Sequence, residues 1–234
     1  MVAIDNAIKK LKLLGHEMML LSETAFIGVN KPTGIATCYT VDKDGKLLFK
    51  SYDSISIVDD YFVAIDKDST EILDTNLKIL SKFKNDDVEA IREGLVVLYR
   101  KSDQAYRLST LHGKPLSDPI IQHIQLWKQS DNIIVKQHIN HDLYKIALIQ
   151  NDKVVRTIEA VNVINVAVGK RINSDENVVV VQTNDTVTMY NEKLTKILLV
   201  ANGVKTHHIS DKCNVLDKYN NIILTIQLGT KLYG

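Results

Sequence analysis

Residues 39–49 read Tyr-Thr-Val-Asp-Lys-Asp-Gly-Lys-Leu-Leu-Phe, which is an apolar strand, a tight polar turn and a second apolar strand. Asn, Asp and Gly favour such turns because they accept a positive φ or hydrogen-bond their own backbone. The pattern recurs about every 32 to 40 residues in six copies, at 39–49, 71–80, 108–116, 147–155, 188–198 and 225–233. A periodic strand-turn-strand unit predicts a repeat protein built of β-sheets.

Short apolar runs precede most of these turns and suit strands that are buried on both faces. We interpret them as the inner strands of successive sheets, at residues 61–65, 95–99, 133–135 and 178–181. A fourth strand follows each turn-containing pair, at residues 88–91, 121–126, 161–166 and 204–209. Four strands per unit with a periodic apolar signature are typical of a β-propeller blade.

The two ends of the chain supply the parts of one further blade. Residues 6–23 align without a gap with residues 76–93, so the N-terminus resembles the outer half of a blade, and residues 213–233 supply an inner strand, a second strand and a turn. We therefore expect a single domain over residues 1–234, a six-bladed β-propeller in which residues 1–23 and 211–234 share a composite blade and close the ring. The remaining repeats span approximately 24–60, 61–93, 94–130, 131–174 and 175–210.

Residues 4–22 also fit a helix, because apolar residues recur at helical spacing after the potential N-cap Asp5. The alternative architecture is then an open β-repeat array with an N-terminal helix. Gly15 interrupts the helical pattern. We favour strands for this segment, because a helix leaves the last blade unfinished and exposes sheet edges.

Composition is that of a globular chain, with 45% hydrophobic residues. No apolar run approaches the length of a membrane span, and Lys9, Lys10 and Lys12 interrupt the first apolar stretch, which argues against a signal peptide. We therefore expect synthesis in the cytoplasm. Cys38 and Cys213 are then expected to be reduced rather than joined in a disulfide.

Charge excludes the simplest electrostatic partners. The formal net charge is +1, and the basic residues are 24 Lys against five Arg. Arg is the usual residue for reading base edges, and a balanced charge gives no general attraction to polyanions. We expect no nucleic-acid partner and no membrane partner.

Two histidine pairs are candidate metal ligands. His138 and His141 flank a hairpin, and His207 and His208 are adjacent in a strand. Neither pair has a Cys or Asp at ligand spacing, and alternation directs His207 and His208 to opposite faces. We interpret all four as partly exposed polar residues.

Acidic residues form three further candidates. Asp42 and Asp44 begin like a calcium loop, but the Glu required at the twelfth loop position is absent and Asp53 is displaced. The pairs Asp59-Asp60 and Asp86-Asp87 recur before apolar runs, where they more simply start strands. No phosphate-binding or nucleophile motif is present. We assign no catalytic, cofactor-binding or metal-binding residue and expect no cofactor.

One segment resembles a known family. Gly34-Ile35, the turn over residues 42–48, Tyr52-Asp53 and residues 61–64 are similar to the bacterial WG-type β repeat, with Thr33 in place of the family's Trp. The resemblance covers residues 25–64. It implies an interaction module rather than an enzyme.

These observations predict a non-enzymatic structural or protein-interaction scaffold that binds protein partners or assembles with itself. Lys-rich, Arg-poor usage with abundant Asn and Ile indicates an AT-rich genome, and one such context is a component of a bacteriophage or other viral particle. The alternative is a ligand-binding or hydrolytic β-propeller with a polar central channel. The residues that begin the inner strands are apolar, which disfavours that alternative: Phe26, Phe62, Leu95, Ile133 and Val179.

Overall fold

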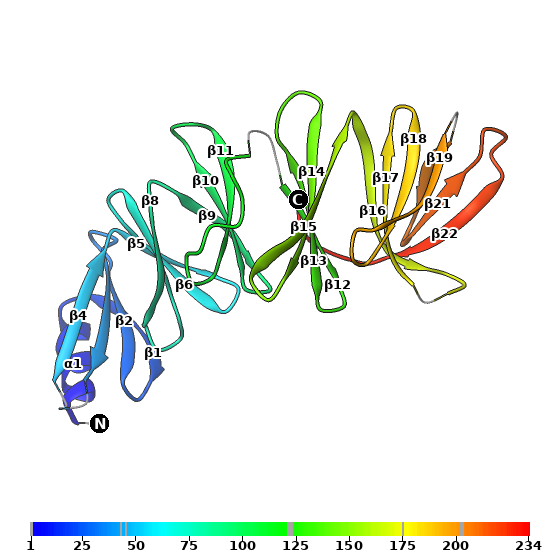
Figure 1. Cartoon of the computed structure of the whole chain (residues 1–234). Helices are drawn as coiled ribbons and strands as arrows, with labels where there is room; N and C mark the ends of the chain where they lie inside the picture. The colour runs from blue at the N-terminus through cyan, green and yellow to red at the C-terminus, as the bar shows by residue number, and fades with distance from the viewer. Residues whose placement is uncertain (1, 43, 45, 121–123, 175, 202–203) are drawn as a thin grey trace. The chain divides into compact units, whose positions relative to one another are not determined.

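The computed structural model confirms the all-β class. It describes residues 2–42, 44, 46–120, 124–174, 176–201 and 204–234, and these contain one helix and 23 strands. The chain divides into two compact units, one of residues 1–103 with 108–115 and one of residues 104–107 with 116–234. In each unit the strands form twisted antiparallel sheets (Figure 1).

The first unit consists of meanders in which consecutive strands are neighbours. Two four-stranded sheets have the orders β1-β2-β3-β4 and β5-β6-β7-β8, and a third sheet, which reaches the division between the units, has the order β11-β10-β9. The strand bounds are β1 His16–Ser22, β2 Ala25–Asn30, β3 Ala36–Val41, β4 Leu47–Tyr52, β5 Ser54–Val58, β6 Tyr61–Asp66, β7 Ser69–Leu73, β8 Ile79–Lys84, β9 Asp87–Arg92, β10 Leu95–Arg100 and β11 Ala105–Thr110.

The second unit contains two larger sheets that depart from a simple meander. Their orders are β15-β14-β13-β12-β23 and β19-β18-β17-β16-β22-β21-β20. The strand bounds are β12 Ile124–Gln129, β13 Asn132–His138, β14 Leu143–Gln150, β15 Lys153–Val161, β16 Val163–Arg171, β17 Asn177–Thr183, β18 Thr186–Asn191, β19 Lys196–Ala201, β20 Lys205–Ile209, β21 Lys212–Leu216, β22 Ile222–Leu228 and β23 Thr230–Tyr233.

Long hairpin loops begin with Asp or Asn, as the sequence predicts. Oδ1 of Asp74 accepts hydrogen bonds from the backbone N–H groups of Asn76 and Lys78, both at 2.9 Å. Asn191 and Asp217 form the same pair of bonds in the β18–β19 and β21–β22 loops. These side chains satisfy backbone donors that the sheet ladder leaves unpaired. Gly45 of the first predicted turn lies outside the described residues.

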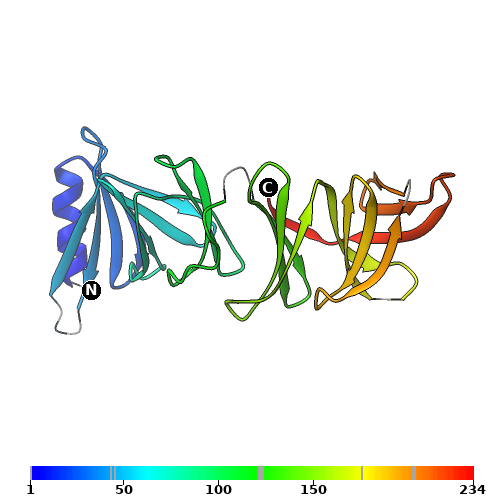
Figure 2. The same cartoon turned by 45° about the horizontal axis from the view of Figure 1, so that its top comes forward.

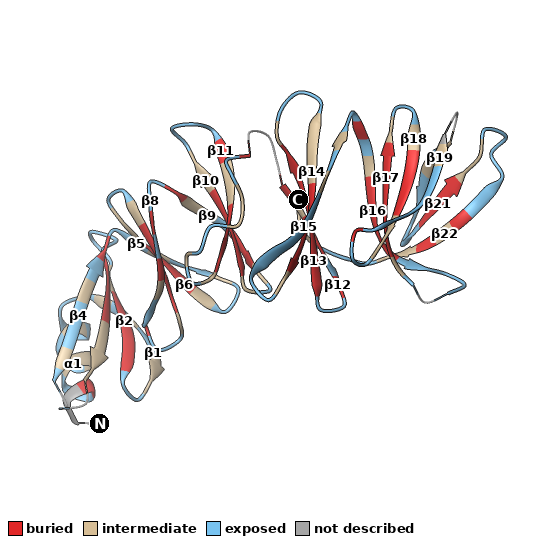
Figure 3. Cartoon of the chain, viewed as in Figure 1, coloured by how far each residue is buried: buried red, intermediate tan, exposed pale blue. Residues whose placement is uncertain are grey.

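The runs interpreted as inner strands are buried on both faces, which confirms that part of the prediction (Figure 3). In chain order, however, these strands are the second and not the first of their sheets: they are β6, β10, β13 and β17. Two-residue turns precede β6, β10 and β13, and also β21, whereas a five-residue loop precedes β17. The first residue of each two-residue turn has a positive φ: Asp59, Glu93, Ser130 and Ser210. Such turns match the twist of paired strands. Each second strand therefore pairs with the strand before it.

The segments predicted to be fourth strands are wrongly placed for the same reason. Residues 88–91 lie in β9, which pairs with β10, so they open a sheet rather than close the preceding one. The segment 161–166 runs into β16, and the segment 204–209 runs into β20. Each of these two strands is also the first of a meander. Of residues 121–126, the first three lie outside the described residues and the others belong to β12. The repeat unit is thus shifted by one strand from the predicted bounds.

The N-terminus contains a helix, α1 (Val2–Leu13), so the strands favoured for residues 4–14 are wrong. Ile4 is buried, Ala7, Ile8 and Leu11 are half-buried, and α1 lies along the β1–β4 sheet (Figure 2). Gly15 ends the helix rather than interrupting it: its φ is 80° and its N–H donates to Lys12 O at 3.1 Å. No helix within the described residues is long and apolar enough to cross a membrane.

The predicted composite blade does not form. β1 is the edge strand of the first sheet and pairs with β2. At the other end β22 pairs with β16 and β21, and β23 pairs with β12. The sixth predicted turn, at residues 225–233, is also no hairpin, since its two strands pair elsewhere. Residues 1–23 and 211–234 thus contribute to different sheets, which removes the basis for six blades and for closure by a shared blade.

The seven-stranded sheet has two halves, β16–β19 and β20–β22, and a close approach between β16 and β22 joins them. Three residue pairs join these strands, from Gly169 with Leu228 to Arg171 with Ile226. A Cβ atom on Gly169 would lie 2.0 Å from the backbone oxygen of Gln227. Around the crossing, the halves share a buried apolar cluster of Ala167, Val178, Val180, Val187, Met189, Cys213, Val215, Leu224 and Ile226.

The variant Gly169→Ala is expected to lower the free energy of unfolding by about 3 kcal/mol, because a backbone atom cannot yield to the new methyl group as a flexible side chain does. Urea unfolding followed by fluorescence of Trp127, which is buried in the same unit, measures this change. The matched control is Gly229→Ala, whose Cβ would lie 3.2 Å from its nearest neighbour, the backbone oxygen of Lys128. Equal effects of the two substitutions would contradict the steric explanation.

Candidate functional site

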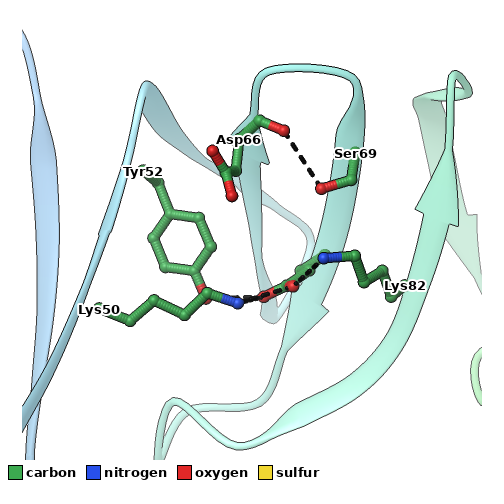
Figure 4. A network of polar contacts seen from close by, with 6 residues as sticks. Lys50, Tyr52, Asp66, Ser69 and Lys82 are labelled. Carbon is green, nitrogen blue, oxygen red and sulfur yellow. Dashed lines mark hydrogen bonds and ion pairs between the residues drawn. The ribbon is translucent and has the colours of Figure 1, made fainter.

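A dense polar cluster surrounds Glu71, a buried acid in the centre of β7. Its side chain is only 2% exposed. It faces the β1–β4 sheet, from which Lys50 and Tyr52 extend toward it, and Lys82 reaches it from the neighbouring strand β8 (Figure 4). The cluster therefore joins two sheets of the first unit.

The carboxylate of Glu71 accepts four hydrogen bonds. Lys50 Nζ donates to Oε1 at 2.7 Å and to Oε2 at 2.6 Å. Tyr52 OH donates to Oε2 at 2.8 Å, and Lys82 Nζ donates to Oε1 at 3.0 Å. Lys50 Nζ also lies 5.0 Å from the centre of the Tyr52 ring. An ionised carboxylate has about four acceptor sites, so this one is saturated.

Electrostatics fix the ionisation of the cluster. Burial acts to raise the pKa of the Glu71 carboxyl, but the hydrogen bonds from Lys50, Tyr52 and Lys82 outweigh it, and the net result is a lowered pKa. The pKa of the Tyr52 hydroxyl is raised, first by burial and then by its hydrogen bond to Glu71. Glu71 therefore stays charged near neutral pH, and Tyr52 stays protonated.

This arrangement ties sheets together and leaves little capacity for chemistry. Glu71 has no free acceptor site for a substrate proton, and its lowered pKa disfavours a role as general acid. The neighbouring Cys38 thiol is also inert, because burial raises its pKa to about 12. Cys213 is a second free, buried thiol, with a pKa of about 11 for the same reason. We interpret the Glu71 cluster as structural.

A second buried acid, Asp86, is held in the same way. Arg100 forms a two-pronged ion pair with it, Nε to Oδ1 at 2.7 Å and Nη2 to Oδ2 at 2.8 Å. Thr70 Oγ1 donates to the backbone oxygen of Asp86 at 2.8 Å. Its sequence neighbour Asp87 begins β9 and pairs with Lys101 at 2.8 Å. The predicted start of a strand at this acidic pair is confirmed.

The other acidic candidates lie in turns. Asp59 and Asp60 form the β5–β6 turn rather than a strand start, and Asp59 pairs with Arg92. Asp42 Oδ1 accepts the backbone N–H groups of Asp44 and Lys46, so the expected turn is confirmed there. Asp53 instead accepts the N–H of Lys67 at 2.8 Å and does not join that loop.

The histidine candidates have separate environments. His138 is buried, so the expected partial exposure is wrong for this residue. Its ring stacks on Tyr144 with centroids 4.2 Å apart, and its Nε2 lies 3.4 Å from the backbone oxygen of His141. His208 Nε2 lies 2.6 Å from Asn165 Nδ2, and its pKa is lowered by burial and then by the charge of His207. Within the described residues no three His, Cys, Asp or Glu side chains gather as a metal site.

Comparisons with known proteins identify no family. No protein-family model matches this chain, and no curated protein matches it. The similarity to the WG-type repeat therefore stays a prediction.

Several solved structures are similar over most of the chain. Kluyveromyces lactis Hsv2 has a TM-score of 0.34 at 11% identity, covering 91% of this chain and 82% of that chain. The Dos1 propeller has a TM-score of 0.35 at 10% identity, covering 89% and 68%. Apo AztD from Citrobacter koseri has a TM-score of 0.29 at 11% identity, covering 94% and 88%. Such TM-scores fix neither the number of blades nor their closure, and the all-β class rests on the strand pairing of the chain itself.

The variant Glu71→Gln is expected to destabilise the protein by about 2 kcal/mol, because it leaves Lys50 and Lys82 beside a buried group without a negative charge. Chemical unfolding followed by circular dichroism measures the change. The control is Glu17→Gln, which breaks an ion pair with Lys31 whose side chains are 67% and 62% exposed. That exposed pair is expected to contribute about 0.5 kcal/mol or less. A similar loss in both variants would contradict the structural role of Glu71.

The contribution of Glu71 is also expected to depend on pH. Because its folded pKa lies below the ordinary value of 4.5, its stabilisation is present above about pH 4.5 and is lost as pH falls through the lowered folded pKa. The difference in unfolding free energy between the wild-type protein and Glu71→Gln should therefore shrink on acidification. Urea titrations at a series of pH values test this, and a constant difference would contradict it.

Proposed function

We propose that this chain is a non-enzymatic interaction scaffold that assembles with a second copy of itself through one of the two edge strands of the seven-stranded sheet. That edge is β19, which pairs with β18 on one side and is terminal in the strand order. An edge strand presents a row of unpaired backbone N–H and C=O groups, which another strand can complete.

Exposed apolar side chains on β19 are the observation that carries this proposal. Ile197, Leu198 and Leu199 are 45%, 38% and 48% exposed. Because successive strand residues point to opposite faces, exposure of three in a row means that both faces of the strand are open. Residues 197–200 read Ile-Leu-Leu-Val and contain no charge, proline or glycine. Such a run is the composition that favours pairing between strands.

Other fourth strands in the chain carry the charges that normally protect an edge. β4 contains Lys50, β8 contains Lys82 and Lys84, and β15 contains Arg156 and Glu159. In β19 the only charged residue is Lys196, at the first position. The apolar stretch is therefore unprotected at the place where a partner strand would bind.

A second copy suits this edge because the stretch is self-complementary. In an antiparallel pair related by a twofold axis, Ile197 lies opposite Val200 and Leu198 opposite Leu199, so apolar side chains meet apolar side chains. Lys196 of each strand then lies beyond the apolar run of the other. The saturated Glu71 cluster supports a non-enzymatic role. A component of a larger assembly, such as a viral particle, would use this edge in the same way.

The expected result is a native mass twice that of the 26.4 kDa chain in analytical ultracentrifugation at tens of micromolar protein. Leu198→Lys should give a monomer, because it places like charges near each other across the twofold axis. The control is Leu48→Lys on the edge strand β4, where the leucine is 45% exposed. Circular dichroism confirms that both variants fold. A monomeric wild-type protein, or dissociation by both substitutions, would overturn the proposal.

A further inference from the structure

A groove of about 500 Å³ lies on the second unit, over β21, β22 and the β16–β17 hairpin. It does not involve β19. It is lined by Arg171, Ile172, Asn173, Lys212, Asn214, Ile222, Ile223, Leu224 and Thr225. This volume falls in the range of sites that hold small molecules or short peptide segments.

Strand alternation directs polar side chains into this groove. Cys213 and Val215 belong to the apolar cluster between the halves of the sheet, so Asn214, which lies between them, points to the opposite face. Thr225 is its cross-strand partner on β22. The hairpin beside them is fixed by its backbone, because Ile172 N–H donates to Thr225 O at 3.1 Å.

Positive charge dominates the lining of the groove. Arg171 and Lys212 contribute cations, and no carboxylate occurs among the described residues that line it. Glu176 lies 3.7 Å from Arg171 Nη1, but both side chains are about half exposed, so this pair is weak. Asp211, next to Lys212, accepts a hydrogen bond from Gln227 Nε2 at 2.7 Å. The two cations thus retain donor capacity toward the groove.

Asn214 supplies an independent sign of a ligand. The residue is 9% exposed, and its Oδ1 accepts a hydrogen bond from Thr225 Oγ1 at 2.8 Å. Within the described residues its amide nitrogen makes no hydrogen bond, and it is not one of the fully buried unpaired polar atoms, so it is open to the groove. These N–H groups can donate to an acceptor that enters the groove. The charged groups of the groove, Arg171 and Lys212, are donors only, and the Asn214 N–H groups add to them, which favours an anion.

Apolar surface adjoins these donors. Ile172, Ile222 and Ile223 are 41%, 60% and 44% exposed. Aliphatic side chains on a partner would cover them and gain about 25 cal/mol per Å² of apolar area removed from water. A polyphosphate backbone has no such groups and would leave the isoleucines in water.

We infer that the groove binds an acidic peptide segment in which one or two carboxylates lie beside aliphatic side chains. The carboxylates pair with Arg171, Lys212 and the Asn214 amide, and the aliphatic side chains cover the three isoleucines. This partner is distinct from the second copy that binds β19, so the chain carries two docking surfaces of different chemistry.

Fluorescence anisotropy with labelled, capped peptides tests the inference. The first probe is Glu-Asp-Ser-Leu-Ile. The second, Gln-Asn-Ser-Leu-Ile, lacks the charges, and the third, Glu-Asp-Ser-Ser-Gly, lacks the aliphatic side chains. Only the first is expected to bind well, with an affinity that falls as salt is added, because exposed charges are screened. Equal binding of the second or third probe would overturn the inference.

Variants locate the site. Lys212→Gln and Arg171→Gln should each weaken binding of the first probe by about threefold to tenfold, the range expected of a partly exposed charged hydrogen bond. The control is Lys153→Gln, an exposed lysine at the start of β15, which should bind as the wild-type protein does. Unchanged binding in both groove variants would overturn the site.

Two further measurements identify the partner. Sodium decanoate should fail to displace the first probe, since displacement as effective as that by unlabelled peptide would assign the groove to a free aliphatic anion instead. Leu198→Lys should bind the probe with unchanged affinity, because the groove lies apart from β19. The proposed peptide site and the self-association proposed for β19 can therefore be disproved independently of each other.

Discussion

The arrangement of this chain depends on strands that have no polar face. In β10, Leu95, Val96, Val97 and Leu98 are each at most 3% exposed. A strand of this kind is stable only when apolar structure covers both faces of its sheet, and each side chain buried in this way contributes about 1.5 to 3 kcal/mol. The sheets must therefore stack on neighbours. The helix α1, with its own apolar stripe, lies along the first sheet.

Stacked sheets leave little room for unsatisfied polar groups, and the buried acids reflect this. The charge of Glu71 is tolerated between two sheets because its carboxylate accepts four hydrogen bonds. The charge of Asp86 is tolerated because Arg100 binds both of its carboxylate oxygens. Removing such groups from water is costly unless every lone pair is satisfied. The interior thus uses its polar chemistry for cohesion. Capacity for partners remains on the surface, at the apolar edge of β19 and in the cationic groove over β21 and β22.

The sequence predicts local structure well where a residue controls its own backbone. Asp74 and Asn191 could be predicted as turn residues because each bonds the backbone within four residues of itself. Asp217 makes the same bonds in a loop that lies outside the six predicted turns. The apolar runs likewise indicated burial. Gly15 was misleading, since a glycine at the end of a helix and one that interrupts it look alike when the end is not known.

Features that depend on distant residues could not be predicted in the same way. In the sequence, Glu71 looks like an ordinary polar residue of a strand. Its partners Lys50 and Tyr52 belong to another sheet, so no rule of sequence spacing connects them with Glu71. The assignment of strands to sheets failed because an acidic pair before an apolar run fits either a strand start or a two-residue turn. The shared terminal blade failed because the partner of a four-residue strand such as β23 is chosen by tertiary contacts rather than by its own residues.

The pairing of β23 with β12 has a consequence for how the second unit forms. Thr230 lies opposite Lys128, whereas the neighbouring hairpins of the same sheet join residues that are close in sequence. Contacts of high sequence separation form late, because a long loop must be closed before they give any stabilisation. During synthesis on the ribosome, β12 to β15 can therefore pair early. The backbone groups on the outer side of β12 stay unpaired until β23 emerges, about a hundred residues later. In that interval β12 is an unpaired edge strand, and the nascent chain is most vulnerable to mispairing at this edge.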